Sequence, residues 1–139
     1  MGKINLGRVV MGGLLAGLVI NISETVLNLF VVAQAMEDAL HARNLPALGG
    51  SAIGGFVGFT FLMGIATIWL YAAIRPRFGA GAGTASIAGL AVWFFAYLFP
   101  AVAEGLMGLF PAKVLTVGTV WGLPEIIVAA IAGAWIYTE

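Results

Sequence analysis

Four long apolar stretches, separated by short polar segments, dominate the hydrophobic pattern of the chain. They cover approximately residues 9–33, 50–74, 84–110 and 114–137. Each is long enough to cross the hydrocarbon core of a bilayer, which takes roughly 20 residues in a helix. Because lipid offers no hydrogen-bonding partners, such stretches must satisfy their backbone groups internally and are expected to be helices. The pattern predicts an all-α integral membrane protein, in which residues 1–139 form a single transmembrane domain, a four-helix bundle.

The connection between the first two stretches is the longest polar segment. Met36 and Leu40 are four residues apart, as on a short helix that lies on the membrane surface, and Pro46 is expected to end that helix. Glu37 and His41 share the same spacing, but one histidine and one carboxylate make an incomplete metal site. We therefore expect a solvated helix face here and assign no metal.

Two pairs of segments indicate an internal repeat. Residues 24–30 and the segment 80 positions later share Glu, Leu and Phe, while residues 65–71 and the segment 66 positions later share Ile, Ala, Trp and Tyr. We interpret the first two helices as a hairpin that is duplicated as the last two, with repeats covering about residues 9–74 and 84–137. Two crossings per unit return the chain to its starting side, so the repeats are expected to be parallel, related by an axis along the membrane normal.

Basic residues set the expected orientation, because cytoplasmic loops carry more of them than loops on the other side. Four lie before the first helix and after the second (Lys3, Arg8, Arg75 and Arg77), whereas two lie in the other connections (Arg43 and Lys113). We expect both termini in the cytoplasm, in a bacterial inner membrane. Trp69, Tyr71, Trp135 and Tyr137 would then lie together at the cytoplasmic interface, where aromatic rings are enriched.

Composition narrows the classes of function. The chain is 62% hydrophobic and 9% charged, and four spans leave no room for a soluble catalytic domain. Its net charge is zero, so we expect no positively charged surface that would bind nucleic acid. It has no cysteine, which excludes thiolate chemistry. The sequence also lacks a nucleophile paired with a base, a phosphate-binding loop and a metal-ligand cluster. We expect neither an enzyme nor a bound cofactor.

Small residues line one face of three of the expected helices. They are Gly13 and Gly17 on the first helix, Gly50, Gly54 and Gly58 on the second, and Gly118, Gly122 and Gly133 on the fourth. In lipid no hydrophobic effect draws helices together, so small residues that let backbones approach closely favour packing. We expect these glycines to be helix contacts, either within the bundle or between subunits.

Polar residues inside the spans are the candidates for chemistry. They are Asn21, Glu24 and Asn28 on the first helix, Glu104 on the third and Glu125 on the fourth. An ionised side chain near a helix centre costs about 2.5 to 3.5 kcal/mol on insertion scales, so these acids need partners or protons. They could form a proton or cation site, or they could be neutral acids hydrogen-bonded to neighbouring groups.

Two functions are compatible with these features. The first is a small scaffold or accessory subunit, surrounded by the lipid bilayer, that packs through its glycine faces into a homo-oligomer or a larger membrane complex. Short polar loops and few polar groups favour this reading. The alternative is a small proton- or cation-coupled transporter or channel that uses the intramembrane glutamates.

Overall fold

The computed structural model describes residues 3–138, and all regular structure in that part of the chain is helical. Four helical spans are long and apolar enough to cross a membrane. They are Leu6–Val31, Gly50–Phe78, Ala82–Leu106 and Ala112–Ile136. This confirms the prediction of a helical, membrane-type fold.

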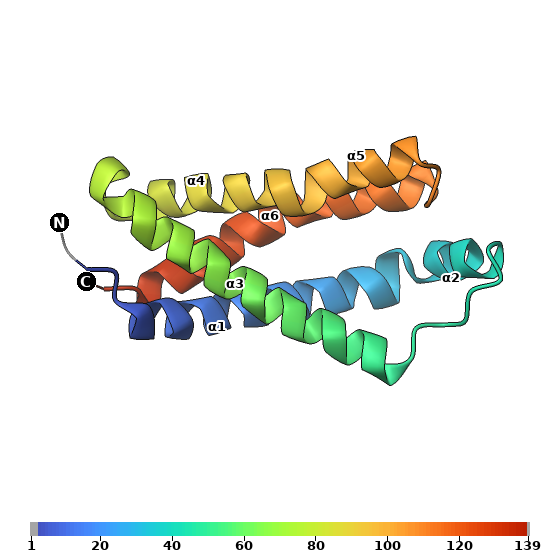
Figure 1. Cartoon of the computed structure of the whole chain (residues 1–139), viewed down its shortest axis with the longest axis horizontal. Helices are drawn as coiled ribbons and strands as arrows, with labels where there is room; N and C mark the ends of the chain where they lie inside the picture. Colours follow the sequence, from blue (N-terminus) through green and yellow to red (C-terminus); the bar gives the residue numbers. More distant parts are fainter. Residues whose placement is uncertain (1–2, 139) are drawn as a thin grey trace.

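The first and third spans each contain a short π-helical turn, which gives eight elements in residues 3–138. In order they are α1 (Leu6–Val26), η1 (Leu27–Val31), α2 (Ala33–His41), α3 (Gly50–Phe78), α4 (Ala82–Trp93), η2 (Phe94–Leu98), α5 (Phe99–Leu106) and α6 (Ala112–Ile136). Both chain ends lie at the same end of the bundle (Figure 1), which we call the terminal end. The opposite end carries the short helix α2, and we call it the α2 end.

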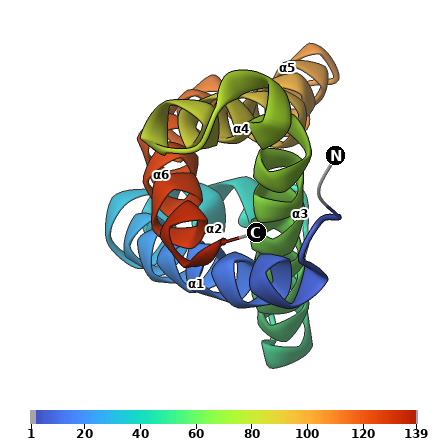
Figure 2. The ribbon, with the colours of Figure 1, turned by 90° about the vertical axis from the view of Figure 1, so that its left-hand side faces the viewer.

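The four spans form a ring when the bundle is seen from the terminal end (Figure 2). In that ring α1 packs against α3 and α6, and α4 packs against the same two helices. Spans that follow each other in the chain are therefore neighbours in the ring, and the contact between α1 and α6 closes it. This arrangement lets side chains on α1, η2 and α6 meet although they are distant in sequence.

The bundle is tightest towards the terminal end, where glycines bring helix backbones together. A side chain on Gly13 would collide with the backbone of Ile65, and one on Gly64 would collide with the backbone of Gly17. Between Gly12 and Gly133 the backbones of α1 and α6 approach equally closely. Fully buried apolar side chains fill this half of the bundle: Ala16, Ile20, Ile68, Ile126, Ala129 and Ala130.

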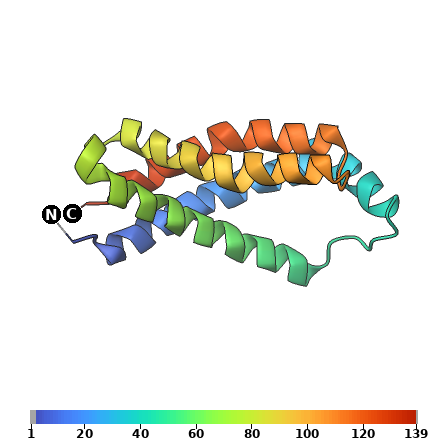
Figure 3. The same cartoon turned by 45° about the horizontal axis from the view of Figure 1, so that its top comes forward.

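Helix α3 leaves the bundle towards the α2 end (Figures 1 and 3). Gly50, Gly54, Gly55 and Gly58 lie in this diverging half, and a Cβ built on any of them would meet no atom within 4 Å. The large apolar side chains of the same segment are exposed. The glycine face of residues 50–58 is therefore without packing partners among the residues that the structure describes.

The two π turns have different local causes. Pro100 lacks a backbone N–H and cannot donate to the carbonyl of Ala96, so the hydrogen-bond ladder of the third span shifts. The N–H of Phe99 bonds the Phe94 carbonyl instead, closing the π turn η2. In the first span, the side-chain amide of Asn28 donates to the Glu24 carbonyl at 2.8 Å, just where η1 begins.

The third span ends earlier than the expected position 110. Gly108 has φ +66°, and two backbone bonds close the helix: Leu109 N–H to Glu104 O at 2.9 Å and Gly108 N–H to Gly105 O at 3.1 Å. This pair of bonds is a Schellman motif, which commonly ends helices at a glycine. The assignment of residues 107–110 to the helix was therefore wrong, because apolar composition continues past the glycine that stops the helix.

The other span boundaries lie within a few residues of their expected positions. The second span continues to Phe78 rather than stopping near position 74, and Pro76 is accommodated in its last turns. The expected short helix of the first connection is present as α2, and it ends at His41, before Pro46. Beyond it, Arg43 donates to the Gly108 carbonyl at 2.8 Å and lies over the Phe110 ring, which ties the two connections of the α2 end together.

The aromatic pairs at the terminal end divide into two kinds. Trp69 and Trp135 are exposed, as residues at a membrane interface are expected to be, and Trp135 is 87% exposed. Tyr71 and Tyr137 instead are buried inside the bundle, where their rings make an edge-to-face contact at 5.9 Å. The two tyrosines therefore pack between helices, whereas the two tryptophans face outward.

Candidate functional site

Glu125 lies in the middle of α6 and is only 6% exposed. Its Oε1 atom accepts a hydrogen bond from the Tyr97 hydroxyl at 2.7 Å, which joins α6 to η2. Gly122 makes this contact possible, because any Cβ at that position would collide with the Tyr97 ring. A glycine one turn before the acid thus lets the phenol lie against the backbone of α6.

The second oxygen of Glu125, Oε2, is also buried. It accepts no hydrogen bond from any residue between positions 3 and 138. The Ser23 hydroxyl and the Glu24 carboxyl, both on α1, lie close enough to interact electrostatically with the Glu125 carboxyl. We call Ser23, Glu24, Tyr97 and Glu125 the acidic site.

Glu24 is the more accessible of the two acids in this site. It is half-buried, and its Oε2 atom accepts a hydrogen bond from the Asn28 side chain at 2.8 Å. Asn28 itself is exposed, one turn nearer the α2 end. Asn21 does not bond to either acid, because its side-chain amide donates to the Gly17 carbonyl at 2.9 Å.

Two tryptophans position the helices around the acidic site. The indole N–H of Trp121 donates to the Ser23 hydroxyl at 2.9 Å, which links α6 to α1. The indole N–H of Trp93 donates to the Thr119 carbonyl at 2.8 Å, which links α4 to α6. On α6 these two bonds lie at Trp121 and Thr119, within two turns of Glu125, so they hold that part of α6 against both α1 and α4.

Glu104 lies apart from the interactions just described. It is half-buried near the end of α5, and its side chain makes no hydrogen bond or ion pair with the residues that the structure describes. Of the five polar residues singled out in the sequence, the structure therefore brings together Glu24 and Glu125, with Asn28 attached to Glu24. It leaves Asn21 bonded to its own helix and Glu104 outside the site.

Sequence reasoning missed Tyr97. A tyrosine in a long apolar helix is a weak signal, because aromatic residues are common there and most of the ring is apolar. A usable signal existed in its hydroxyl, since a phenol O–H in the middle of a span needs an acceptor and Glu125 is one of few candidates.

The glycines of the predicted packing faces occupy two different environments. Gly13, Gly17, Gly122 and Gly133 lie at close contacts inside the bundle. Gly118 on α6 and the three α3 glycines (Gly50, Gly54 and Gly58) face open space within the chain. The second group would have to find its contacts outside a single copy of the protein.

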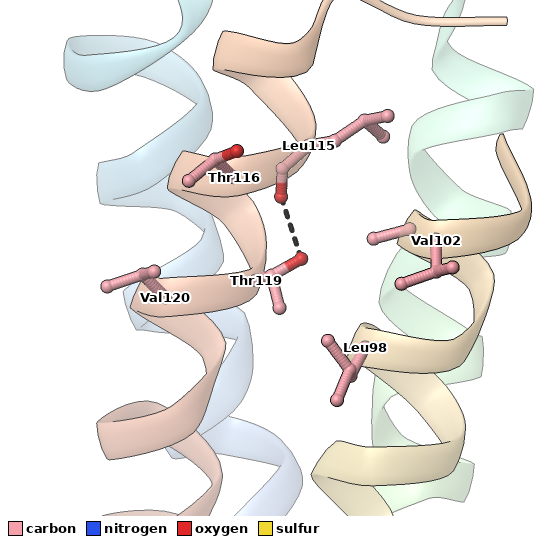
Figure 4. Close-up of a pocket in the computed structure, with 7 residues that line it drawn as sticks. Leu98, Val102, Leu115, Thr116, Thr119 and Val120 are labelled. Carbon is pink, nitrogen blue, oxygen red and sulfur yellow. Dashed lines mark hydrogen bonds between the residues drawn. The ribbon is translucent and has the colours of Figure 1, made fainter. Parts of the chain in front are cut away.

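Two apolar hollows lie on the surface of the bundle. The larger, about 720 Å³, lies between α3 and the α4–η2 segment, and its lining includes Phe59, Met63 and Phe95. The smaller, about 240 Å³, lies between the third span and α6 (Figure 4). Its lining includes Leu98 and Thr119, and the Thr119 hydroxyl is bonded to the Leu115 carbonyl of its own helix at 2.7 Å. Neither hollow is lined by a charged residue.

Comparison with other proteins identifies no relative. No family model matches the sequence, and neither the curated proteins nor the solved structures contain a significant match. The chemistry open to the chain must therefore be argued from its own side chains, and the acidic site is the feature from which to start.

Proposed function

We propose that the protein is a small membrane scaffold or accessory subunit that packs through α3 into an oligomer or a larger membrane complex. The observation that carries this proposal is the diverging half of α3. Gly50, Gly54 and Gly58 recur every four residues, on one face of the helix, and have no neighbour within the chain. Glycines that face lipid gain nothing from their small size, whereas glycines that face another helix allow close backbone contact.

The larger apolar hollow adds to this support. It begins at Phe59, one residue beyond the glycine face, and continues along α3 towards Leu70. A helix from another subunit laid along α3 would cover the glycines and extend into this hollow. Such a helix would also shield the exposed apolar residues Ile53 and Phe56 from lipid.

Size-exclusion chromatography and copurification of the native protein test this proposal. We expect a defined assembly, either of several copies or with a fixed set of larger partners. Gly54→Leu and Gly58→Leu should disrupt it, because a leucine on this face keeps the partner helix away. Gly83→Leu is the matched control, since Gly83 also has open space around it but lies at the terminal end.

Two outcomes would contradict the subunit proposal. One is a strictly monomeric native protein that brings no partner from the membrane. The other is an assembly that tolerates Gly54→Leu and Gly58→Leu as well as it tolerates Gly83→Leu, because the α3 face would then not be the contact.

We also propose that the two hairpins are tandem repeats, and the terminal end supplies support beyond sequence similarity. The Tyr71 hydroxyl accepts the N–H of Gly81, the N-cap of α4, at 3.2 Å. The Tyr137 hydroxyl accepts the N–H of Asn5, the N-cap of α1, at 3.3 Å. Each hairpin therefore uses its last tyrosine to bind the start of the other hairpin, as parallel repeats would.

Superposing one hairpin on the other in an experimental structure tests the repeat. The two N-caps are 76 residues apart, whereas Glu24 and Glu104 are 80 apart. Counted from the N-cap of its own span, Glu104 therefore lies about one helical turn nearer the α2 end than Glu24 does. Aligning the two Glu-to-Phe segments instead predicts equal depth for the two acids. Hairpins related by inversion, rather than by rotation about the membrane normal, would contradict the repeat.

The second candidate function is a small proton- or cation-coupled transporter or channel, and the burial of Glu125 favours it. An intramembrane acid without a basic partner is a common feature of proton and ion pathways. Glu24→Gln and Glu125→Gln keep the side-chain shape but cannot titrate. We expect these variants to assemble and to lose proton or cation flux in proteoliposomes, with Glu104→Gln as the control. Absence of wild-type flux for protons and for every cation tested would exclude this candidate.

A further inference from the structure

The hydrogen bonds of Glu125 distinguish its two oxygens. Oε1 accepts the Tyr97 hydroxyl, while Oε2 is buried and accepts nothing from the described residues. An ionised carboxylate has only acceptor oxygens, and a buried acceptor without a donor is destabilising. A protonated carboxyl needs an acceptor at its O–H instead. Neither state has a described partner at Oε2, but an unpaired buried charge costs more than an unpaired neutral O–H, so the surroundings of Glu125 favour a proton on Oε2.

The charges around Glu125 favour the same state. The titratable groups that face it are Glu24 on α1 and Tyr97 on η2. Neither acid has a described hydrogen bond or ion pair with a basic side chain, and all six basic residues lie at the ends of spans or in the connections. Two carboxylates close together in a low-dielectric interior repel each other strongly, so the pair must hold at least one proton.

The acidic site has polar surroundings on one side only. Towards the α2 end, the half-buried Glu24 is followed by the exposed Asn28, which bonds to its carboxyl. Towards the terminal end, Glu125 is followed by fully buried apolar residues, among them Ile126 and Ala129. Thr67 is buried in the same region, but its hydroxyl donates to the Met63 carbonyl of its own helix at 2.8 Å. That half of the bundle offers no titratable group for a proton until Tyr71 and Tyr137.

We propose that Glu125 and Glu24 form a binding site for exchangeable protons that is reached from the α2 end alone. In the exchange, the O–H bond at Glu125 Oε2 breaks and an O–H bond forms on an ionised oxygen of Glu24. The negative charge moves to Glu125 and the total charge of the pair is unchanged. Glu24 then releases its proton to water at the α2 end, and binding follows the reverse order. The proposal requires neither transport nor assembly, so it stands apart from both candidate functions.

Carbodiimide modification tests the proton on Glu125 directly. Dicyclohexylcarbodiimide is apolar and reacts with protonated carboxyl groups, and peptide mass spectrometry identifies the modified residue. In sealed vesicles at neutral pH we expect Glu125 to be modified several-fold more than Glu37, which is exposed on α2 outside the four spans. An unmodified Glu125, or equal modification of the two acids, would overturn the proposal.

Sidedness is tested by raising the pH on one side of the vesicles at a time. The chain has no cysteine, so a single Ala42→Cys substitution reports which vesicles expose the α2 end to an impermeant maleimide. We expect modification of Glu125 to fall when the medium at the α2 end becomes alkaline and to be unaffected from the terminal end. A response to the terminal side, or no response to either side, would overturn the proposal.

The role of Glu24 is separated from simple folding effects by Glu24→Gln. This variant keeps an amide that can bond Asn28, so we expect it to insert and to retain modification at Glu125. The response to alkaline medium at the α2 end should become several-fold slower, because the intermediate proton carrier is gone. Glu104→Gln should respond like the wild type. An unchanged response in Glu24→Gln would contradict the exchange through Glu24.

Discussion

At the scale of single residues, the acidic site depends on a few contacts between helices that are distant in sequence. The phenol of Tyr97 supplies the hydrogen bond to Glu125, and Gly122 supplies the space for its ring. Trp121 and Ser23 hold α6 against α1 beside them. These residues come from α1, η2 and α6, so the site exists only when the bundle is assembled.

Tyr97→Phe should destabilise the bundle without changing its helices. The substitution leaves Glu125 with no described hydrogen bond, and an unsatisfied buried polar group costs about 1 to 3 kcal/mol. Thermal unfolding in detergent, followed by circular dichroism, should show a lower midpoint. Trp135→Phe serves as the control, because that ring is exposed and its replacement should change stability by less than about 0.5 kcal/mol. Equal midpoints for Tyr97→Phe and the wild type would show that the bond contributes nothing.

Gly64→Leu should disrupt the contact between α1 and α3 far more than Gly54→Leu does. A side chain at Gly64 meets the backbone of Gly17, which cannot move aside as a side chain can, and overpacking typically costs about 1 to 3 kcal/mol or more. Gly54 lies on the same helix with open space around it. Unfolding of the monomeric protein in detergent compares the two. Similar losses would mean that the helices separate to accept the larger residue.

At the scale of elements, prolines and glycines decide where the spans bend and end. Pro100 lacks a backbone N–H, and the π turn η2 forms just before it. This turn places Tyr97 in a widened segment of the third span. Gly108 ends α5 through its left-handed backbone, and its carbonyl receives Arg43 from the other connection. The α2 end is therefore organised by backbone geometry as much as by side chains.

Gly108→Ala should weaken the end of α5 and its link to α2. A residue with a Cβ at φ +66° costs roughly 1 to 2 kcal/mol, because only glycine adopts this conformation freely. Hydrogen–deuterium exchange should speed up at Leu109, whose N–H closes the Schellman motif. Gly83→Ala is the control, since Gly83 lies within α4 and has open space around it. Unchanged exchange at Leu109 would show that the motif tolerates a side chain.

At the scale of the whole molecule, the helices pack closely at the terminal end and diverge at the α2 end. Glycine contacts join α1, α3 and α6 near the terminal end, whereas α3 stands away from the others near the α2 end (Figure 3). If all four spans cross the membrane, as proposed, both chain ends are expected on the same side of it. The proposed partner helix would pack at the α2 end, and the proposed proton exchange would also occur from this end, on a different face of the bundle.

Single cysteines test the expected orientation of the whole chain. Because more basic residues lie at the terminal end, we expect Thr138→Cys to react only from the cytoplasmic side and Ala42→Cys only from the opposite side. An impermeant maleimide applied to intact cells and to inverted vesicles distinguishes the two. Reversed reactivity would contradict the orientation, and reactivity of each site from both sides would indicate dual topology.

The sequence alone was sufficient to predict the membrane-type fold, because satisfying the backbone in lipid is a local requirement that each apolar stretch meets by itself. The short helix α2 was also predictable from the spacing of Met36 and Leu40, although it ends at His41 and not at Pro46. Glu24 and Glu125 were visible as candidates, because an acid in a span is costly wherever its helix packs.

Only the tertiary structure decided which of these residues meet. It joined Glu125 to Tyr97 and placed Glu24 beside them, while Glu104, equally conspicuous in the sequence, stayed outside. The tertiary structure also decided which glycines lie at close contacts between helices, such as Gly64, and which face open space, such as Gly54. The physical reason is that helix rotation and crossing are set by packing between helices, whereas helix formation is set within each helix.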